Sequence, residues 1–256
     1  MIHNIDPIFI SIGEFHIYWY GIMYLLAFLA AWLLGNYFIK KRIVKISEDH
    51  FSDLLFYNFI GVLVGGRVGY SIFYNFSYTF ENPISILYLW NGGMSFHGGF
   101  IGVIFSIFYF CKKNKVSFFE ISDFLVRLVP IGLFTGRIGN FINGELWGKP
   151  TDLIWAVIFP KIDNMPRHPT QIYEAFFEGF VLFIILNFMV SKDIKPSVLT
   201  SYFLILYSLF RFLIEFFRVP DSHIGYLAFS WVTMGQLLCF PMFILGLFIL
   251  KYRKGN

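Results

Sequence analysis

The sequence predicts an all-α integral membrane protein with about seven transmembrane helices. Only 14% of its 256 residues are charged and 57% are hydrophobic, whereas roughly 25% of the residues in a soluble domain are charged. Several apolar stretches reach the ~20 residues that a helix needs to cross the hydrocarbon core. Lys and Arg gather in alternate connections between these stretches, which is typical of a chain that crosses a membrane repeatedly.

Seven apolar stretches are the candidate spans. They cover residues 17–39, 51–74, 94–111, 118–136, 171–190, 199–218 and 231–250. The fourth and sixth are the weakest, because Asp123, Arg127, Arg211 and Glu215 interrupt them. The chain shows no internal repeat and no low-complexity linker, so we expect one domain over residues 1–256.

The distribution of basic residues predicts the orientation. The connections at 40–45, 112–115 and 192–195 and the tail at 251–254 contain more than half of the 20 Lys and Arg residues, and the positive-inside rule places them in the cytoplasm. Residues 75–93 contain neither Lys nor Arg and are expected outside. An odd number of spans then puts the N-terminus outside and the C-terminus in the cytoplasm. The net charge of +4 follows from this signal, and no nucleic-acid partner is required.

The outer face is predicted to be elaborated. The connection from about residue 137 to residue 170 contains Gly, Pro, Trp and several polar residues, and it is too long to be a turn. The chain begins without a basic n-region or an A-x-A-like site, so we expect the first span itself to direct insertion.

Neither a metal nor a cofactor is expected. Cys111 and Cys239 stand apart, which argues against a disulfide framework or a cysteine-based metal site. The carboxylates and histidines show no metal-ligand spacing, and no nucleotide-binding motif occurs.

Ionisable residues inside the spans mark the candidate site. Each costs about 2.5–3.5 kcal/mol on insertion scales, so such residues usually face a polar interior. Those in or beside the spans are Arg67, His97, Asp123, Arg127, Arg137, Glu145, Glu174, Glu178, Arg211, Glu215 and Arg218. We expect several of them to meet in one polar cavity.

The densest polar segment is Gly136–Gly148, at the outer end of the fourth span. Its four glycines permit a compact loop that a ligand can approach closely, and Arg137 can direct two N–H donors at a phosphate. Asn140 and Asn143 supply uncharged donors, while Glu145 can pair with an arginine or act as a base. The alternative is a glycine-rich loop with a snorkelling arginine.

Two further segments carry reactive or charged groups. His97 lies among glycines at the start of the third span, where an imidazole can accept a proton near neutral pH; the alternative is a hydrogen bond between helices. In the sixth span, Tyr207, Arg211 and Glu215 recur every four residues and share one helix face. Their alternative is a structural Arg211–Glu215 ion pair.

Together these segments suit an anionic phospholipid. They place several arginines, a histidine, a tyrosine and glycine-lined approaches in the outer half of the bundle. Two other classes remain open: a transporter that carries an anionic head group, although no paired broken helices are visible, and a seven-helix receptor, which would leave this cluster unexplained.

The sequence resembles the prolipoprotein diacylglyceryl transferase family. Gly136–Gly148 matches the family signature G-R-x-G-N-F-x-N-G-E-x-x-G at every fixed position. Supporting matches occur at 19–21, 65–67, 95–99, 168–171 and 207–218, so the resemblance covers nearly the whole chain. Departures are mild: Ile172 replaces a common leucine, Ser208 a common glycine, and the outer loops are short.

The resemblance implies an activity. Such an enzyme of the bacterial inner membrane transfers the diacylglyceryl group of phosphatidylglycerol to the lipobox cysteine of a prolipoprotein, with its site towards the periplasm. The implied catalytic residues are His97, Arg137, Glu145 and Arg211. The implied phosphatidylglycerol-binding residues are Arg137, Arg211, Asn140, Gly148, Tyr20, Tyr207, Glu215 and Arg67. His97, Glu145 and a water all remain candidates for the base, and the oligomeric state is open.

Overall fold

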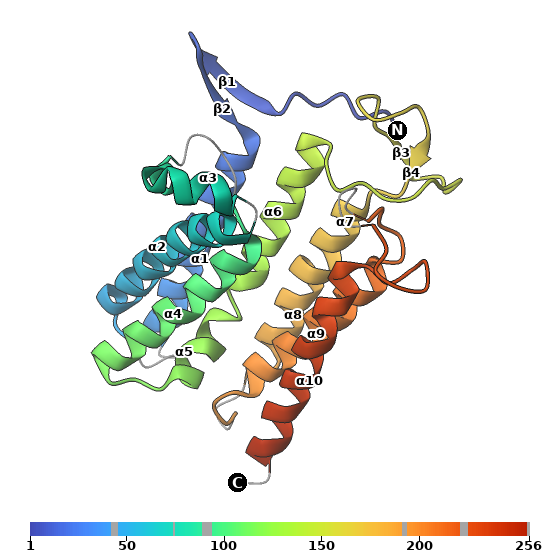
Figure 1. The fold of residues 1–256 in the computed structure, drawn as a ribbon. Helices are drawn as coiled ribbons and strands as arrows, with labels where there is room; N and C mark the ends of the chain where they lie inside the picture. Colours follow the sequence, from blue (N-terminus) through green and yellow to red (C-terminus); the bar gives the residue numbers. More distant parts are fainter. Residues whose placement is uncertain (42–45, 74, 89–93, 191–193, 221–224, 255–256) are drawn as a thin grey trace. The chain divides into compact units, whose positions relative to one another are not determined.

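The computed structural model describes residues 1–41, 46–73, 75–88, 94–190, 194–220 and 225–254, and it is mainly helical (Figure 1). Two strands precede the first helix, and two very short strands lie between the sixth and seventh. The elements are β1 (Ile8–Ile12), β2 (Phe15–Tyr18), α1 (Trp19–Lys40), α2 (Glu48–Phe73), α3 (Phe76–Glu81), the 3-10 helix η1 (Pro83–Leu87), α4 (Phe96–Asn114), α5 (Phe118–Leu125), α6 (Val129–Asn143), β3 (Val157–Ile158), β4 (Pro166–Arg167), α7 (Thr170–Glu174), the π-helix η3 (Ala175–Val181), α8 (Leu182–Phe188), α9 (Val198–Ile214) and α10 (Met234–Lys254).

The chain forms two compact units. The first consists of Met1–Leu34 and Asp123–Asn256, and the second is Gly35–Ser122. Within the first unit, α6 packs against α7, η3 and α8, and α9 packs against α10. Figure 1 shows α9 and α10 side by side at the C-terminal end of the chain.

Four described helical segments are long and apolar enough to cross a membrane. They are Trp19–Lys40, Glu48–Ile72, Thr170–Phe188 and Met234–Tyr252. Helix α9 is apolar but has 17 residues. The prediction of a mainly helical membrane protein is therefore confirmed, and each of the seven apolar stretches is largely helical. The number of seven spans stays a prediction.

The fourth expected span is broken, which corrects the prediction of one helix over 118–136. Helix α5 ends at Leu125, and α6 begins at Val129 with Pro130 in its first turn. Proline fits there because the first helical N–H groups have no partner within the helix. Helix α6 also continues to Asn143, so the first part of the Gly136–Gly148 segment is helical instead of a loop.

A buried carboxylate connects α5 to the start of α9. Asp123 Oδ2 accepts a hydrogen bond from the Ser197 N–H at 2.8 Å, and its Oδ1 accepts from the N–H and hydroxyl of Thr200 at 2.8 and 2.5 Å. The first N–H groups of a helix lack intrahelical partners. Asp123 therefore caps α9 from α5, which gives this ionisable residue a structural role.

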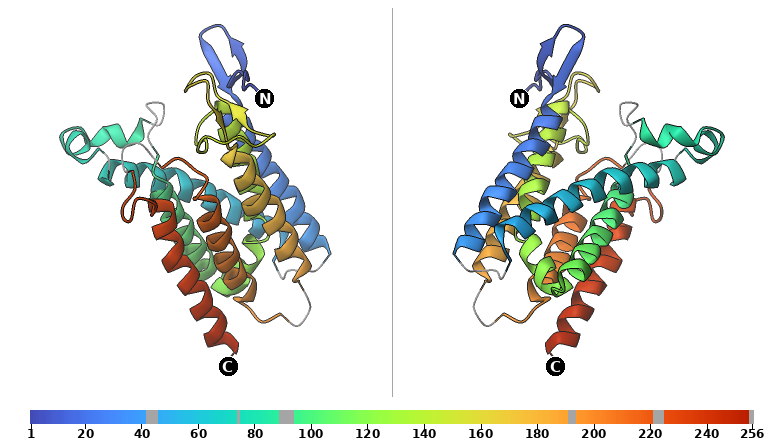
Figure 2. Two further views of the ribbon diagram at one scale, coloured as in Figure 1. Left: turned by 90° about the vertical axis from the view of Figure 1, so that its right-hand side faces the viewer. Right: turned by 90° about the vertical axis from the view of Figure 1, so that its left-hand side faces the viewer.

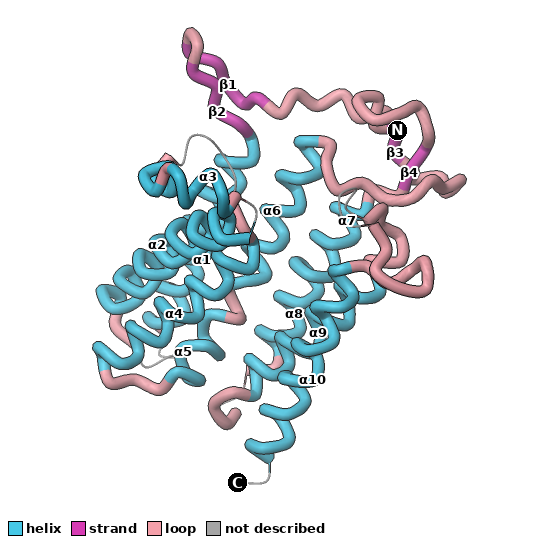
Figure 3. Tube along the Cα trace, in the orientation of Figure 1, coloured by secondary structure: helices cyan, strands magenta, loops and turns pink. Residues whose placement is uncertain are grey.

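The strands form two separate antiparallel pairs, β1–β2 and β3–β4 (Figure 3). The β1–β2 hairpin leads directly into α1, as Figure 2 shows. Its register pairs Ile10 with Ile17 and Ile12 with Phe15. The β3–β4 pair lies in the long connection before α7, and Ile2 forms a bridge with Ile158 beside it. This connection is thus folded, and it positions the segment that follows α6.

Glycines hold α2 and α4 together in the second unit. A Cβ at Gly65 would lie 2.3 Å from the Gly98 carbonyl oxygen, and one at Gly61 would lie 2.6 Å from that of Gly102. Such spacing of small residues allows helix backbones to approach closely in membranes. Gly98, one of the glycines beside His97, therefore packs against α2 instead of lining an approach for a ligand.

This contact predicts that Gly98→Ala destabilises the protein. The added Cβ would lie 2.2 Å from the Gly65 carbonyl oxygen, and overpacking of this kind costs about 1–3 kcal/mol. Gly132→Ala is the matched control, because a Cβ there meets nothing within 4 Å. Thermal unfolding in detergent should give a lower melting temperature for Gly98→Ala only. Equal melting temperatures for the two variants would contradict the packing role.

Candidate active site

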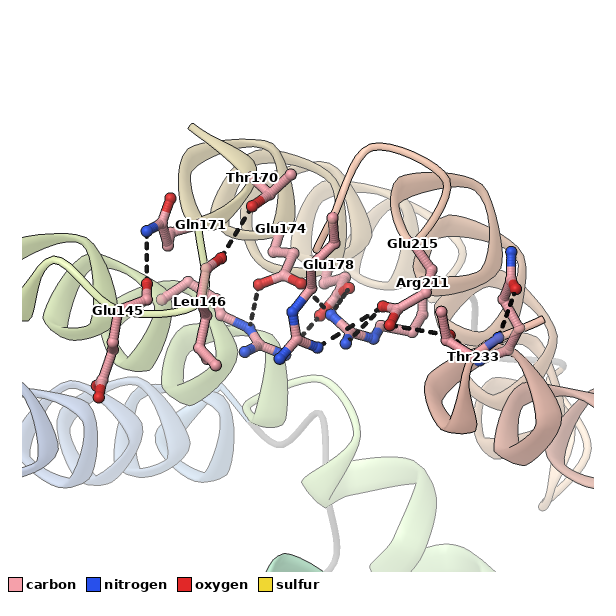
Figure 4. A network of polar contacts seen from close by, with 12 residues as sticks. Glu145, Leu146, Thr170, Gln171, Glu174, Glu178, Arg211, Glu215 and Thr233 are labelled. Atoms are coloured by element: carbon pink, nitrogen blue, oxygen red, sulfur yellow. Dashed lines mark hydrogen bonds and ion pairs between the residues drawn. The ribbon is translucent and has the colours of Figure 1, made fainter. Parts of the chain in front are cut away.

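A buried cluster of arginines and glutamates lies in the first unit. Arg137 Nε of α6 is 3.1 Å from Glu174 Oε2, and its Nη2 is 3.6 Å from Glu178 Oε2. Arg211 of α9 pairs with Glu174 through Nη1, and its Nη2 is 2.7 Å from Glu215 Oε2. Figure 4 shows the carboxylates of Glu174, Glu178 and Glu215 converging on Arg211. Several ionisable residues of the spans therefore meet in ion pairs, whereas the polar cavity expected around them stays a prediction.

Arg218 and Thr233 extend the cluster to the chain after α9 and to the residue just before α10. Arg218 Nη1 lies 3.7 Å from Glu215 Oε2. Glu215 also accepts a hydrogen bond from the Thr233 hydroxyl at 3.0 Å. The predicted proximity of Arg211 and Glu215 on one helix face is confirmed by their ion pair. A hydroxyl and two guanidinium groups thus hold the Glu215 carboxylate.

Helix α7 and the π-helix η3 each direct one carboxylate towards the arginines. Glu174 ends α7 and Glu178 lies within η3, and both side chains are fully buried. Gly179 beside them packs on Phe134 of α6, where a Cβ would be 2.6 Å from the Phe134 Cβ. Wide helical turns of this kind often occur at functional sites. Close packing of η3 on α6 brings Glu174 and Glu178 within reach of Arg137.

The segment after α6 is tied down over the start of α7. Gly144 ends α6 in the left-handed conformation, with φ 71°. The Thr170 hydroxyl then donates to the Leu146 carbonyl at 2.9 Å, and Gln171 Nε2 donates to the Glu145 carbonyl at 2.5 Å (Figure 4). These bonds link the signature segment to the helix that carries Glu174.

Glu145 has amide partners. Its Oε1 accepts hydrogen bonds from Asn140 Nδ2 at 2.8 Å and Asn143 Nδ2 at 3.2 Å. Among the described residues it forms no ion pair with an arginine within 4.0 Å, so the first of its two predicted roles is not seen, and the role as a base stays a prediction. The Glu145 residue is exposed while Asn140 is buried, so Glu145 lies at the surface of the first unit, just after the end of α6.

Gly148 is enclosed by backbone. A Cβ there would lie 2.6 Å from both the His168 Cβ and the His168 carbonyl oxygen. Its N–H donates to that carbonyl at 2.9 Å, and its own carbonyl accepts from Arg167 Nη1 at 3.1 Å. The Arg167 guanidinium also lies 4.6 Å from the centroid of the Trp147 ring. Burial of His168 in the same region lowers the pKa of its imidazole. Gly148 thus allows the signature segment to pack on the outer connection.

Tyr20 packs on α6, and Tyr207 belongs to α9. The Tyr20 ring lies over Gly139, where a Cβ would be 2.9 Å from Tyr20 Cδ2, and its hydroxyl is 3.1 Å from the Tyr24 hydroxyl. Tyr207 lies one turn before Arg211 and stacks on Phe203 with ring centroids 5.8 Å apart. Both tyrosines are partly buried.

Arg67 and His97 belong to the second unit. Arg67 Nε donates to the Ile86 carbonyl at 3.0 Å, and its Nη2 donates to that of Ser85 at 2.8 Å. Arg67 also lines a small cavity of about 80 Å³ together with Tyr70, Ser71, Asn75, Tyr78, Thr79 and Ser85. His97 lies in the first turn of α4, and its side chain is outside the described residues. The two units are described separately, so both residues stay predictions as members of the site.

The comparisons with known proteins show which family the chain belongs to. The profile of the prolipoprotein diacylglyceryl transferase family matches residues 7–252. A phosphatidylglycerol–prolipoprotein diacylglyceryl transferase from Methylococcus capsulatus is 48% identical over 251 residues, covering 96% of this chain and 94% of that protein. Relatives of the same name from Pseudomonas savastanoi and Legionella pneumophila are 49% and 47% identical, over 98% and 96% of this chain and 95% and 96% of their own. The chain belongs to the prolipoprotein diacylglyceryl transferase family.

The sequence did not indicate that two glutamates belong to the site. Glu174 and Glu178 were recognised as ionisable but were not assigned to the site, although they contact both Arg137 and Arg211. Their four-residue spacing within an apolar stretch was the available signal. Their arginine partners come from other helices, which spacing along the chain does not specify.

The ion pairs predict that removing the charge of Glu174 lowers the stability of the protein more than removing the charge of Glu178. Glu174→Gln should destabilise the protein by about 3–5 kcal/mol, because Arg137 and Arg211 both lose their closest carboxylate in a buried site. Glu178→Gln should cost less, since neither Glu178 oxygen accepts a hydrogen bond in the described structure. Thermal unfolding in detergent provides the comparison. A loss for Glu178→Gln that equals or exceeds that for Glu174→Gln would contradict the assigned contacts.

Proposed function

We propose that this protein transfers the diacylglyceryl group of phosphatidylglycerol to the thiol of a lipobox cysteine in prolipoproteins. A bond forms between the cysteine sulfur and a glycerol carbon, and the bond between that carbon and the phosphate oxygen breaks. The thiol proton leaves, and glycerol phosphate is released. The family match over residues 7–252 carries this proposal, and the names of the relatives supply both substrates.

The arginine cluster suits the leaving phosphate. Transition-state charge is best stabilised by donors that are fixed before the reaction. Arg137 and Arg211 are held by buried carboxylates, and the Arg137 side chain is 18% exposed against 9% for Arg211. Arg137 uses Nε and Nη2 in its ion pairs. We therefore place the phosphate against Arg137, with Arg211 supporting it.

The attacking thiol needs a base. A free thiol has a pKa of about 8.5, and the thiolate is the nucleophile. His97 is our first candidate for accepting the proton, directly or through a group that it orients. Glu145 is the second, because its carboxylate is exposed next to the cluster-bearing helix and accepts hydrogen bonds only from amides among its described contacts. A water is the third.

The remaining residues shape the head-group site in this proposal. The first three lie in or near α6 and the segment after it: Asn140, Gly148 and Tyr20. Tyr207 lies one turn before Arg211 in α9. Glu215 orients Arg211 through their 2.7 Å ion pair. Arg67 is the further residue that we propose for head-group binding.

The proposal includes a topology. Seven spans place the N-terminus in the periplasm and the C-terminus in the cytoplasm of the inner membrane, with the active site towards the outer leaflet. The basic segments at 112–115 and 251–254 support this orientation. Residues 1–256 then serve as one transferase domain.

The transfer can be measured by mass spectrometry. A synthetic lipobox peptide incubated with the purified protein and phosphatidylglycerol in detergent should gain one diacylglyceryl group on its cysteine, with glycerol phosphate released. Arg137→Ala should reduce turnover by about 10²-fold or more, the scale seen when one transition-state donor is removed.

Two outcomes of this assay distinguish the alternatives. An unmodified peptide, with folded protein and bound lipid, would favour transport of the lipid over transfer. In the same assay, near-normal turnover by His97→Gln would exclude His97 as the base, which would leave Glu145 or water.

The sidedness can be tested by cysteine labelling in cells. Replacing Cys111 and Cys239, which are both free and buried, by Ala gives a background that should keep measurable activity, because the nucleophilic cysteine belongs to the substrate. A single cysteine at Asp152 should then react with a membrane-impermeant maleimide added outside, while one at Lys113 should not. The reverse labelling would overturn the topology.

A further inference from the structure

Among the described residues, the ion pairs of the buried cluster balance without any ligand. Its ion pairs join three arginines, Arg137, Arg211 and Arg218, to three glutamates, Glu174, Glu178 and Glu215. A lipid phosphodiester carries one negative charge. Its arrival at Arg137 would therefore leave one negative charge without a partner in a buried site, which is strongly unfavourable.

Glu178 is the glutamate that the cluster holds least tightly. Its oxygens are 3.6 Å from Arg137 Nη2 and 3.7 Å from Arg211 Nη1, and neither accepts a hydrogen bond in the described structure. Glu174, in contrast, receives a hydrogen bond from Arg211 and lies 3.1 Å from Arg137. Glu215 lies 2.7 Å from Arg211 and accepts from Thr233.

A protonated Glu178 would remove the excess charge. Burial favours the neutral form of a carboxyl group, and a nearby anion favours it further. The Glu178 side chain is fully buried, and it faces the same two guanidinium groups to which we assign the phosphate. Its loss of charge would free Arg137 Nη2 to face the anion, while Arg211 Nη1 would stay paired with Glu174.

We propose that Glu178 takes up one proton when the anionic phosphodiester of a lipid binds at Arg137. Glu178 is then a positioning residue that acts through Arg137 and Arg211, and it couples lipid binding to pH. This inference rests on the proposed function only in taking a phosphodiester lipid as the ligand of Arg137.

Among the titratable groups around it, Glu178 is the one whose protonation can change when the anion binds. The helices packed on η3 are α6, α7, α8 and α9, and α8 carries no titratable side chain. The other titratable groups near Glu178 are Arg137, Arg211, Glu174, Glu215, Tyr207 and Cys239. Arginines stay charged, and Tyr and Cys are ordinarily neutral near pH 7. Glu174 and Glu215 are held by close arginine contacts.

The test is the pH dependence of lipid binding in the absence of a thiol peptide, so that no turnover occurs. Fluorescent short-chain phosphatidylglycerol is titrated into the detergent-purified protein from about pH 6 to about pH 9. Proton uptake requires the Kd of the wild type to rise with pH, by up to about tenfold per unit. Glu178→Gln fixes the group in a neutral form, so its Kd should stay near the low-pH value of the wild type throughout. Asp152→Asn removes an exposed carboxylate of the outer connection, outside the ion-paired cluster, and it should keep the wild-type slope.

Either of two results would overturn the inference: a wild-type Kd that does not change with pH, or a folded Glu178→Gln protein that keeps the wild-type slope. If Glu178→Gln does not fold, an indicator dye in weakly buffered wild-type protein decides the question. Saturation with lipid should take up about one proton per lipid bound, and no uptake would reject the proposal. Transfer to the lipobox peptide without pH-dependent binding would reject this inference alone, whereas absence of lipid binding would reject the proposed function as well.

Discussion

Arg137 and Arg211 are cations inside an apolar helical bundle, and the carboxylates of Glu174, Glu178 and Glu215 neutralise them. A buried charge without a partner is strongly destabilising, so these contacts constrain how α6, α7, η3 and α9 pack. The same contacts fix two guanidinium groups in place before a substrate arrives. Structure and chemistry in the first unit therefore depend on one ion-pair network.

The outer connection is coupled to this network through hydrogen bonds from side chains to backbone carbonyls. Thr170 and Gln171 bind the carbonyls of Leu146 and Glu145, one turn before Glu174. Gly148 lies close to the His168 backbone and bridges to Arg218. The signature segment is thus partly a packing element, and its glycines serve close backbone contact as well as access for a ligand.

The second unit depends on a different constraint. Gly61, Gly65, Gly98 and Gly102 allow α2 and α4 to touch along their backbones, which is a common solution where apolar side chains gain little by leaving lipid for protein. A histidine flanked by glycines looks the same in sequence whether those glycines admit a substrate or a neighbouring helix. Only the position of α2 shows that Gly98 contacts a helix.

The sequence by itself determined that this is a helical membrane protein, where its apolar segments lie, and which family it belongs to, because hydropathy, periodicity and the Gly136–Gly148 signature are local properties. It also indicated the Arg211–Glu215 contact, since both lie on one helix face. The break before Val129, the cap from Asp123 to α9 and the partners of Glu174 and Glu178 were decided by tertiary structure. These features join segments far apart in the chain, and the energy of a buried charge depends on what packs around it in three dimensions.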